Sequence, residues 1–227
     1  MDDLPPQNIM TTISETIPKR AAQSTAKPVP KGKVKIAKAL ISLLEEKEFN
    51  AITTAQISQR SGVSEALIYK YFGDKRDLLH QVLGGYLDDY LDQLELELRG
   101  IKGTLKRLRK LIWSQLNLYE SNRVLTQILL LDVRSSPCYF DSESYAQVKR
   151  HSKIIMNILE EGVKKGELRR DVPLVSMRQV ILGGIEHMCL PKIIYKKRYS
   201  PEDLTKDLFK IVLEGIVNRP ANNKKTA

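Results

Sequence analysis

The residues best able to do chemistry lie in a short polar stretch, residues 53–75, and the chemistry they suit is binding. Thr53 or Thr54 offers a hydroxyl that can cap a first short helix. Gly62 supplies a turn at which a positive φ costs little, and Ser64 can cap a second short helix. Two short helices joined by a tight turn are the geometry of a helix-turn-helix, whose second helix enters the DNA major groove by its N-terminal residues. The spacing therefore predicts a DNA-binding element.

The first residues of that second helix are placed to read DNA sequence, because side chains at the entering end can reach base edges. We expect this role for Ser64, Glu65, Ala66 and Leu67. Glu65 is unusual, since a carboxylate repels phosphate and can only accept a hydrogen bond, for example from cytosine N4. Glu65 either selects sequence or only favours the positive end of the helix dipole while pointing to solvent, and both interpretations remain open.

The string ITTAQISQRSGVSEALIYKYFGDKRDLL closely resembles the DNA-binding domain of TetR-family transcription regulators. The resemblance rests on threonine at the start of the first short helix, a Gly-Val-Ser turn, a Leu/Ile-Tyr pair with Tyr/His-Phe after it and a lysine that opens the next helix. In this sequence these residues are Thr53 and Thr54, Gly62-Val63-Ser64, Ile68-Tyr69, Tyr71-Phe72 and Lys75. The match covers about residues 34–82.

The resemblance also implies which side chains hold DNA phosphates, a role that fixes register without reading sequence. The matching positions are Thr53, Thr54, Tyr69, Tyr71 and Lys75, and we add Gln56 and Lys70 to this set. Half-buried packing on the helix rim is the alternative role for the two tyrosines. Ile57, Val63, Ile68, Phe72 and Ala37 are assigned to the core that holds the reading helix rigid.

Helical periodicity extends over most of the chain, and no strand-like alternation competes with it. An apolar stripe that begins at Val34 predicts a helix ending near Phe49 and Asn50, and Asp74 and Asp77 have capping-box-like spacing at the start of a later helix. The later helices are expected at about 75–98, 104–120, 122–134, 141–165, 173–198 and 201–218. The sequence therefore predicts an all-α fold.

We expect a flexible arm over residues 1–33, which carry five prolines, a helix-turn-helix domain over 34–82 and a larger helical domain over 83–220. A disordered tail is expected over 221–227. The resemblance implies that the larger domain binds a small effector and forms a homodimer. A dimer is also expected because one short reading helix covers only a few base pairs. Two-fold pairing lets two such helices bind a palindromic operator on double-stranded DNA.

In the resembled family the dimer interface is built mostly from the last two long helices. The residues expected there are Gly183, Gly184, Leu208, Ile211 and Val212. Two adjacent glycines lower helix propensity by about 1 kcal/mol each, so close approach of another helix or a ligand is a reasonable compensation. Pro191 should kink or end the first of these helices.

An apolar pocket between helices favours a small hydrophobic or amphipathic effector. Its candidate lining residues are Trp113, Leu116, Tyr119, Leu125, Ile128, Leu129, Tyr145 and Met156, with Glu186 and His187 as polar anchors. Packing in the core is the commoner role for any one of the apolar residues. The KKGELR turn and the RQVILGGIEH run resemble fatty-acid-responsive members, which points to an acyl-CoA or fatty acid. The phosphates of an acyl-CoA could contact a group of basic residues, although a solvated face is the commoner role for such a group. These residues are Lys102, Lys106, Arg107, Arg109 and Lys110.

Composition limits the other possibilities. The net charge of +10 suits an anionic partner, although residues 34–82 hold seven Lys/Arg against six Asp/Glu. Cys138 and Cys189 lack CxxC spacing, which argues against a disulfide framework or a zinc site. No apolar run approaches the ~18 residues of a membrane span, and the start of the sequence lacks the order of a signal peptide, so we expect a cytoplasmic protein with no membrane partner.

Catalysis is not expected, because three scattered histidines, two lone cysteines and no phosphate loop organise no reaction. No metal or cofactor is expected apart from the effector. The favoured interpretation is a ligand-responsive repressor. A multidrug-responsive regulator of an efflux gene differs from it only in ligand. A sequence-indifferent architectural protein is the third alternative, and it would bind random duplex nearly as well as its best site.

Overall fold

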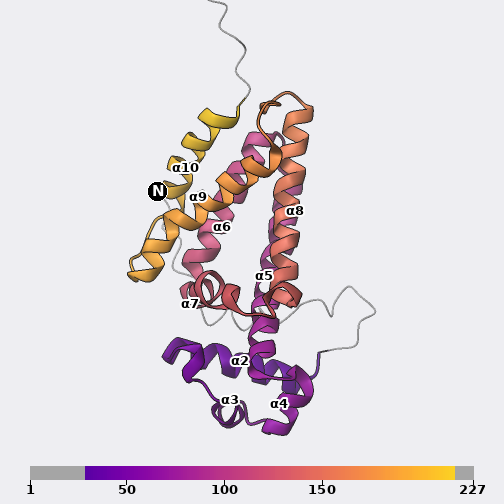
Figure 1. Ribbon diagram of the computed structural model, residues 1–227, viewed down its shortest axis with the longest axis vertical. Coiled ribbons are helices and arrows are strands. Elements are labelled where there is room, and N and C mark those ends of the chain that lie inside the picture. Colours follow the sequence, from indigo (N-terminus) through magenta and orange to yellow (C-terminus); the bar gives the residue numbers. More distant parts are fainter. Residues whose placement is uncertain (1–28, 218–227) are drawn as a thin grey trace, which may run out of the picture. The chain divides into compact units, whose positions relative to one another are not determined.

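The computed structural model describes residues 29–217, and within that range regular structure is helical. The expected all-α architecture, an N-terminal helix-turn-helix domain followed by a larger helical domain, is confirmed (Figure 1). The described residues contain one isolated antiparallel bridge, between Leu168 and Val217. None of the described helices combines the length and the hydropathy needed to cross a membrane. The expected tail and the arm up to residue 28 lie outside the described residues.

The chain divides into two compact units, and each takes residues from two stretches of sequence. One unit contains the described residues through Gln93 together with Asn122–Lys149. The other contains Leu94–Ser121 and the residues from Arg150 onward. The expected division into a DNA-binding domain over 34–82 and an effector domain over 83–220 is a division by function, and it stays a prediction.

The first unit opens with α2 (Lys31–Glu46), the 3-10 turn η2 (Phe49–Ala51), α3 (Thr54–Ser61) and α4 (Glu65–Phe72). The long helix α5 (Lys75–Arg99) follows them. Large apolar side chains from each helix are fully or almost fully buried and make the core that positions α4: Ile36, Leu40, Ile52, Ile57, Ile68, Phe72 and Leu78. The expected core roles of Ile57, Ile68 and Phe72 are thus confirmed, while Ala37 and Val63 are half-buried.

The helix α2 differs from its expected range at both ends. It begins at Lys31, so the last three residues of the expected arm are helical. The apolar stripe starts only at Val34, and a helix can begin one turn before its first apolar residue, which is why periodicity alone placed the boundary too late. It ends at Glu46, and the residues around Phe49 form the separate turn η2.

The stretch expected as one helix over 122–134 is instead broken into short helical pieces. They are α7 (Arg123–Gln127), a π-helical turn η3 (Ile128–Asp132) and a 3-10 turn η4 (Val133–Ser135). A further 3-10 turn, η5 (Tyr139–Asp141), precedes α8 (Glu143–Lys164). The Asn122 side chain accepts from Leu125 N and the Ser135 hydroxyl donates to Asp132 O, so polar side chains compete with regular helical bonds at both ends.

The second unit is built from α6 (Thr104–Ser121), α9 (Leu174–Ile194) and α10 (Pro201–Ile216), with the adjoining parts of α5 and α8. The helix α10 packs on both α6 and α9 (Figure 1). The helix α9 ends four residues before its expected end, three residues after Pro191. Proline lacks an amide hydrogen and cannot sustain the helix, and Lys196 then adopts a φ of 54°.

Candidate nucleic-acid interface

The helix α3 is fixed at its start by a reciprocal capping box. The Thr53 side chain accepts from Gln56 N, and the Gln56 side chain accepts from Thr53 N, each at 3.2 Å. The choice left open between two threonines is therefore resolved, because Thr53 is the cap and Thr54 is the first helical residue. Both capping side chains are occupied by the fold, and a phosphate contact from Thr53 or Gln56 stays a prediction.

The turn between α3 and α4 depends on Gly62, whose φ of 66° lies in the left-handed region that favours glycine. The next helix then begins after Ser64, as expected. Ser64 occupies the N-cap position, but its side chain makes no capping hydrogen bond, so the expectation that its hydroxyl caps the helix is wrong. Its extended backbone, with ψ at 149°, is enough to end the turn, and the exposed hydroxyl stays available to a ligand.

A chain of hydrogen bonds joins the two short helices at their outer surface. The Thr54 hydroxyl donates to Glu65 Oε2 at 2.6 Å, and Thr54 Oγ1 lies 3.3 Å from Tyr69 Oη. Since the single hydroxyl hydrogen of Thr54 points to the carboxylate, the Tyr69 hydroxyl is the donor in the second contact. Glu65 lies in the first turn of α4, as expected, but its carboxylate is held by Thr54.

The four expected base-reading residues lie together at the start of α4. Ser64, Glu65 and Ala66 are exposed, and Leu67 is half-buried. Tyr69 has 49% of its surface exposed one turn further on, and Lys70 beside it is exposed as well. This end of α4 therefore presents hydroxyl, carboxylate and ammonium groups to solvent on a short, rigidly held helix. The roles assigned to these residues on DNA stay predictions.

Tyr71 points in a different direction and packs within the unit. It is half-buried, its ring lies edge-on to Phe72 with centroids 6.3 Å apart, and Lys33 Nζ lies 5.9 Å from its ring centroid. A Cβ at Gly32 would come within 3.1 Å of the Tyr71 ring, so α2 approaches it closely. These contacts favour rim packing for Tyr71 more than for Tyr69.

Lys75 has a structural role that the sequence did not predict. Its Nζ donates to Phe49 O at 3.0 Å and to Ile52 O at 2.5 Å, and lies 4.4 Å from the Phe49 ring centroid. Burial, with a smaller effect of the neighbouring Arg76 charge, lowers the pKa of Lys75. The ammonium thus satisfies carbonyls of η2, and its expected phosphate contact stays a prediction.

A salt bridge that sequence reasoning missed holds α3 on α2. Arg60 pairs with both carboxylate oxygens of Glu46, at 2.8 and 3.0 Å, and donates to the Ser42 hydroxyl at 2.7 Å. The hydrogen bond from Arg60 lowers the pKa of Glu46. The residues are 14 apart in sequence, so only the crossing of the two helices brings them together.

The structure divides the expected effector-pocket residues between the two units. Leu125, Ile128, Leu129 and Tyr145 lie in the first unit, where the leucine and isoleucine side chains are buried. The remaining candidates lie in the second unit: Leu116 and Tyr119 are buried, Trp113, Met156 and Glu186 are half-buried, and His187 is exposed. Neither unit by itself brings the whole set together.

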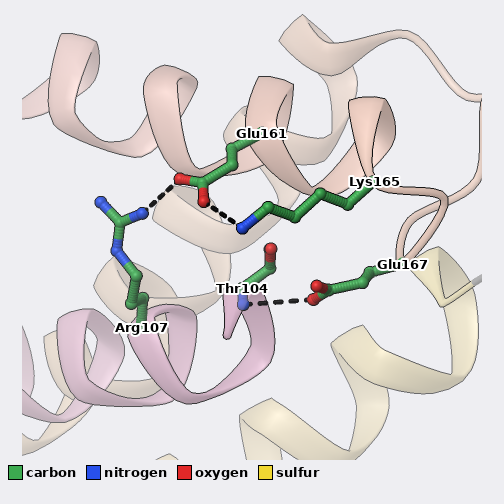
Figure 2. Close-up of polar contacts among 5 residues, drawn as sticks. All are labelled: Thr104, Arg107, Glu161, Lys165 and Glu167. Carbon is green, nitrogen blue, oxygen red and sulfur yellow. Dashed lines mark hydrogen bonds and ion pairs between the residues drawn. The ribbon is translucent and has the colours of Figure 1, made fainter. Parts of the chain in front are cut away.

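Three of the five basic residues considered for effector phosphates are paired with carboxylates of the second unit. Arg107 pairs with Glu161, which also accepts from Lys165 at 2.5 Å, and Glu167 accepts from Thr104 N at 3.1 Å beside them (Figure 2). Arg109 pairs with Glu202 at 2.6 Å, and Lys110 pairs with Glu97 at 2.8 Å. The KKGELR turn therefore secures α8 to α6, while Lys102 and Lys106 are exposed.

The fold and the exposed start of α4 define a helix-turn-helix regulator with a larger helical domain. The family model for "Bacterial regulatory proteins, tetR family" matches residues 36–82, and the model for "YsiA-like protein, C-terminal region" matches residues 81–215. The second match alone spans more than half of the chain. The chain belongs to the tetR family of bacterial regulatory proteins, as its motifs predicted, and is a DNA-binding transcription regulator.

One curated relative and two solved structures match this chain over nearly their whole length. The chain is 21% identical over 186 residues to a fatty acid metabolism regulator protein of Bacillus subtilis, covering 82% of this chain and 96% of the relative. A Bacillus subtilis FadR structure in complex with stearoyl-CoA superposes with a TM-score of 0.73 at 20% identity, covering 80% and 97% of the two chains. The fatty acid degradation regulator FadR from Bacillus halodurans gives 0.74 at 19% identity, covering 85% and 100%.

Proposed function

We propose that this chain is a homodimeric repressor that binds a palindromic operator through α4 and leaves it when a small hydrophobic effector binds the helical body. The observation that carries the proposal is the exposed start of α4, where Ser64, Glu65 and Ala66 face solvent beside Tyr69 and Lys70. Hydroxyl and ammonium donors suit phosphate, and short side chains at a helix start suit base edges. The protein acts by binding, in the cytoplasm, without a catalytic step.

An exposed apolar face on the last two helices supports the dimer. Val180 on α9 and Ile211 on α10 have 60% and 68% of their surface exposed. Gly183, on the exposed side of α9, has nothing within 4 Å of where a Cβ would lie, so packing within one chain does not require this glycine. Leu208 and Val212 are instead 4% exposed in the core of the unit, and a Cβ at Gly184 would meet Leu208. We therefore place Gly183 and Ile211 at the interface and the other three residues behind it.

The proposed effector is a long-chain acyl-CoA or fatty acid. The names of the Bacillus relatives support this class, and so does the apolar character expected of a pocket between helices. A multidrug-responsive regulator remains the alternative, since it would share the fold and the DNA-binding end. An effector that favours a wide-set dimer by about 3 kcal/mol would weaken operator binding by roughly a hundredfold.

The DNA-binding function is tested by capturing sheared genomic DNA from the source organism with the purified full-length protein at physiological salt. The matched control is the double variant Tyr69→Ala/Lys70→Ala, because both side chains are exposed and their removal spares the core. Recovery of a few palindromic promoter sites with the native protein, and their loss with the variant, is the expected result. Uniform recovery of random sequence by both proteins would instead favour the architectural alternative.

The effector is tested by releasing a captured operator with stearoyl-CoA, using free coenzyme A as the control that carries the phosphates without the acyl chain. Release by the acylated compound alone supports the acyl-CoA assignment. Release by unrelated cationic drugs, without an effect of stearoyl-CoA, would favour the multidrug alternative.

A further inference from the structure

A cysteine and a buried histidine lie together in the first unit, outside the candidate interface. His80 on α5 is 2% exposed, and its Nε2 lies 4.0 Å from Sγ of Cys138. On the other side of the ring, His80 Nδ1 lies 2.9 Å from the hydroxyl oxygen of Ser144. Cys138 is exposed, and its Sγ is also hydrogen-bonded to Ser136 Oγ at 3.1 Å, where either atom can be the donor.

The fold holds this cluster by close packing of the start of α8 on α5. A Cβ at Gly84 would lie 2.4 Å from Glu143 Cγ, so only glycine permits the observed approach at this position. The ring of Tyr139 lies beside His80, with centroids 6.3 Å apart, and it also contacts the rings of Phe140 at 5.6 Å and Tyr145 at 5.2 Å. The imidazole is therefore fixed in position, although Cys138 is open to solvent.

Hydrogen bonding assigns the tautomer of the imidazole. The Ser142 hydroxyl donates to Tyr139 O at 2.5 Å, so its single hydrogen is used there. In the 3.0 Å contact between Ser142 and Ser144, Ser144 must then be the donor. The Ser144 oxygen can therefore only accept from His80 Nδ1–H, which leaves the lone pair of Nε2 directed at the thiol.

The chemistry of this arrangement is that of a thiol with an adjacent base. Burial lowers the pKa of His80, so the ring is the neutral, proton-accepting form at neutral pH. Once the thiol has lost its proton, the Ser136 hydroxyl can only donate to the sulfur, which stabilises the thiolate. Cys189 has different surroundings, because it is buried and burial raises the pKa of its thiol to about 12.

We propose that Cys138 is a modification site that reacts with small disulfides of the glutathione class, with His80 as its base and Ser144 as the residue that positions His80. The thiol proton passes to His80 Nε2, and the sulfur attacks one sulfur of the disulfide. A new S–S bond forms, the old one breaks, and the released thiolate takes the proton from His80. Cys138 is oxidised and one sulfur of the reagent is reduced, so no other reactant is needed. The site lies in the unit that also contains α3 and α4.

The test measures the rate at which oxidised glutathione modifies Cys138 in full-length C189S protein at pH 7, with mass spectrometry to locate the adduct. The folded protein is expected to react about tenfold faster than the same protein unfolded in urea, because only the fold holds His80 Nε2 beside the thiol to accept its proton. This comparison needs no change at His80. Equal or slower reaction of the folded protein would overturn the proposal.

A second measurement assigns the base. H80N in the C189S background is expected to slow the reaction about tenfold, whereas the control H187N, at an exposed histidine, leaves the rate within twofold. If H80N folds with an unchanged urea midpoint and keeps the native rate, His80 is not the base. Neither experiment involves DNA, so the outcome is separate from that of the proposed function.

Discussion

Two lysines that follow one another closely in sequence have different surroundings, and this separates their expected roles. Lys70 is exposed on α4, whereas the Lys75 ammonium donates to Phe49 O and Ile52 O. We expect Lys70→Ala to weaken binding to all DNA sequences about equally and to lower the salt slope by about 1.8, because the proposed dimer loses two phosphate contacts at about 0.9 each. The measurement is operator and random-duplex affinity over a range of salt concentrations. A change in base preference would contradict a phosphate contact.

Lys75→Ala is expected to act on stability. It removes the ammonium donor of Ile52 O, whereas Phe49 O still accepts from Ile52 N at 3.1 Å, and an unsatisfied buried carbonyl costs about 1–3 kcal/mol. Urea denaturation followed by circular dichroism measures this loss, with Lys70→Ala as the matched control expected to stay within about 0.5 kcal/mol of the native protein. Native stability of Lys75→Ala together with weakened DNA binding would show instead that the ammonium holds phosphate.

Glu65 is the residue whose role on DNA is most sharply testable. Its carboxylate accepts from Thr54 through Oε2 and keeps a further acceptor oxygen at the exposed start of α4. Glu65→Gln replaces an acceptor-only group with one that also donates, so it should shift the preferred base at one operator position by about 1–3 kcal/mol. Selection from randomised duplexes compares the preferences. An unchanged preferred sequence would assign Glu65 to the helix dipole and the Thr54 contact alone.

The histidine His151 on α8 should make stability depend on pH. Burial lowers its pKa to about 4, below the ordinary value of 6.5. Between these two values the unfolded chain binds a proton that the folded chain excludes, so stability is full above pH 6.5 and falls as the pH drops towards 4. The difference amounts to at most about 3 kcal/mol, at about 1.4 kcal/mol for each pH unit. The difference between the urea midpoints at pH 7 and pH 4.5 should be smaller in H151N than in the native protein, with a remainder from His80, and it should be unchanged in H187N.

At the scale of the element, adjacent glycines in α9 give a matched pair of variants. A Cβ at Gly184 would lie 2.7 Å from Leu208 Cδ1, whereas a Cβ at Gly183 would meet nothing within 4 Å. Gly184→Ala should destabilise the fold by about 1–3 kcal/mol through overpacking between α9 and α10. Gly183→Ala should stabilise the helix by up to about 1 kcal/mol and weaken the dimer. Urea denaturation and sedimentation measure the two effects, and a dimer unaffected by Gly183→Ala would place the interface elsewhere.

Most helices of the body follow directly from sequence periodicity. The observed helices α6, α8 and α10 begin and end within two residues of the expected ranges 104–120, 141–165 and 201–218. The cap at Asp74 was predictable too, because its partners are three residues apart and Asp77 N donates to Asp74 Oδ1 at 2.7 Å, whereas the hydroxyl cap expected at Ser64 does not form. Periodicity failed over 122–134, where apolar residues favour a helix of any type and do not distinguish an α-helix from π and 3-10 turns.

Contacts between elements were beyond the reach of the sequence. The Thr54 hydroxyl meets Glu65 across eleven residues, and Lys75 finds its carbonyl acceptors more than twenty residues earlier. His80 and Cys138 are 58 residues apart, and no motif in the sequence pairs them. The residue types at the start of α4 were predictable from a motif, but the partner of each side chain depends on how the helices cross.

On the scale of the whole molecule, two helices bear on regulation. The long helices α5 and α8 each contribute residues to both compact units, so neither unit is a separate stretch of chain. Under the proposed function, operator binding through α4 and effector binding in the helical body favour two different arrangements of a dimer. The operator then stabilises one arrangement of this dimer and the effector stabilises the other, so each ligand opposes binding of the other.

That competition must be reciprocal. If stearoyl-CoA lowers operator affinity by some factor between about 5-fold and 150-fold, then saturating operator must lower stearoyl-CoA affinity by the same factor, because both describe one coupling free energy of about 1–3 kcal/mol. Calorimetry with and without the captured operator measures the second factor, and DNA titration with and without stearoyl-CoA measures the first. A random duplex, which engages the reading helices weakly, should lower acyl-CoA affinity much less at the same concentration. If operator affinity instead kept falling in proportion to acyl-CoA concentration, with no limiting factor, the acyl-CoA would be occupying the DNA-binding surface itself, and the helical body would have no part in release.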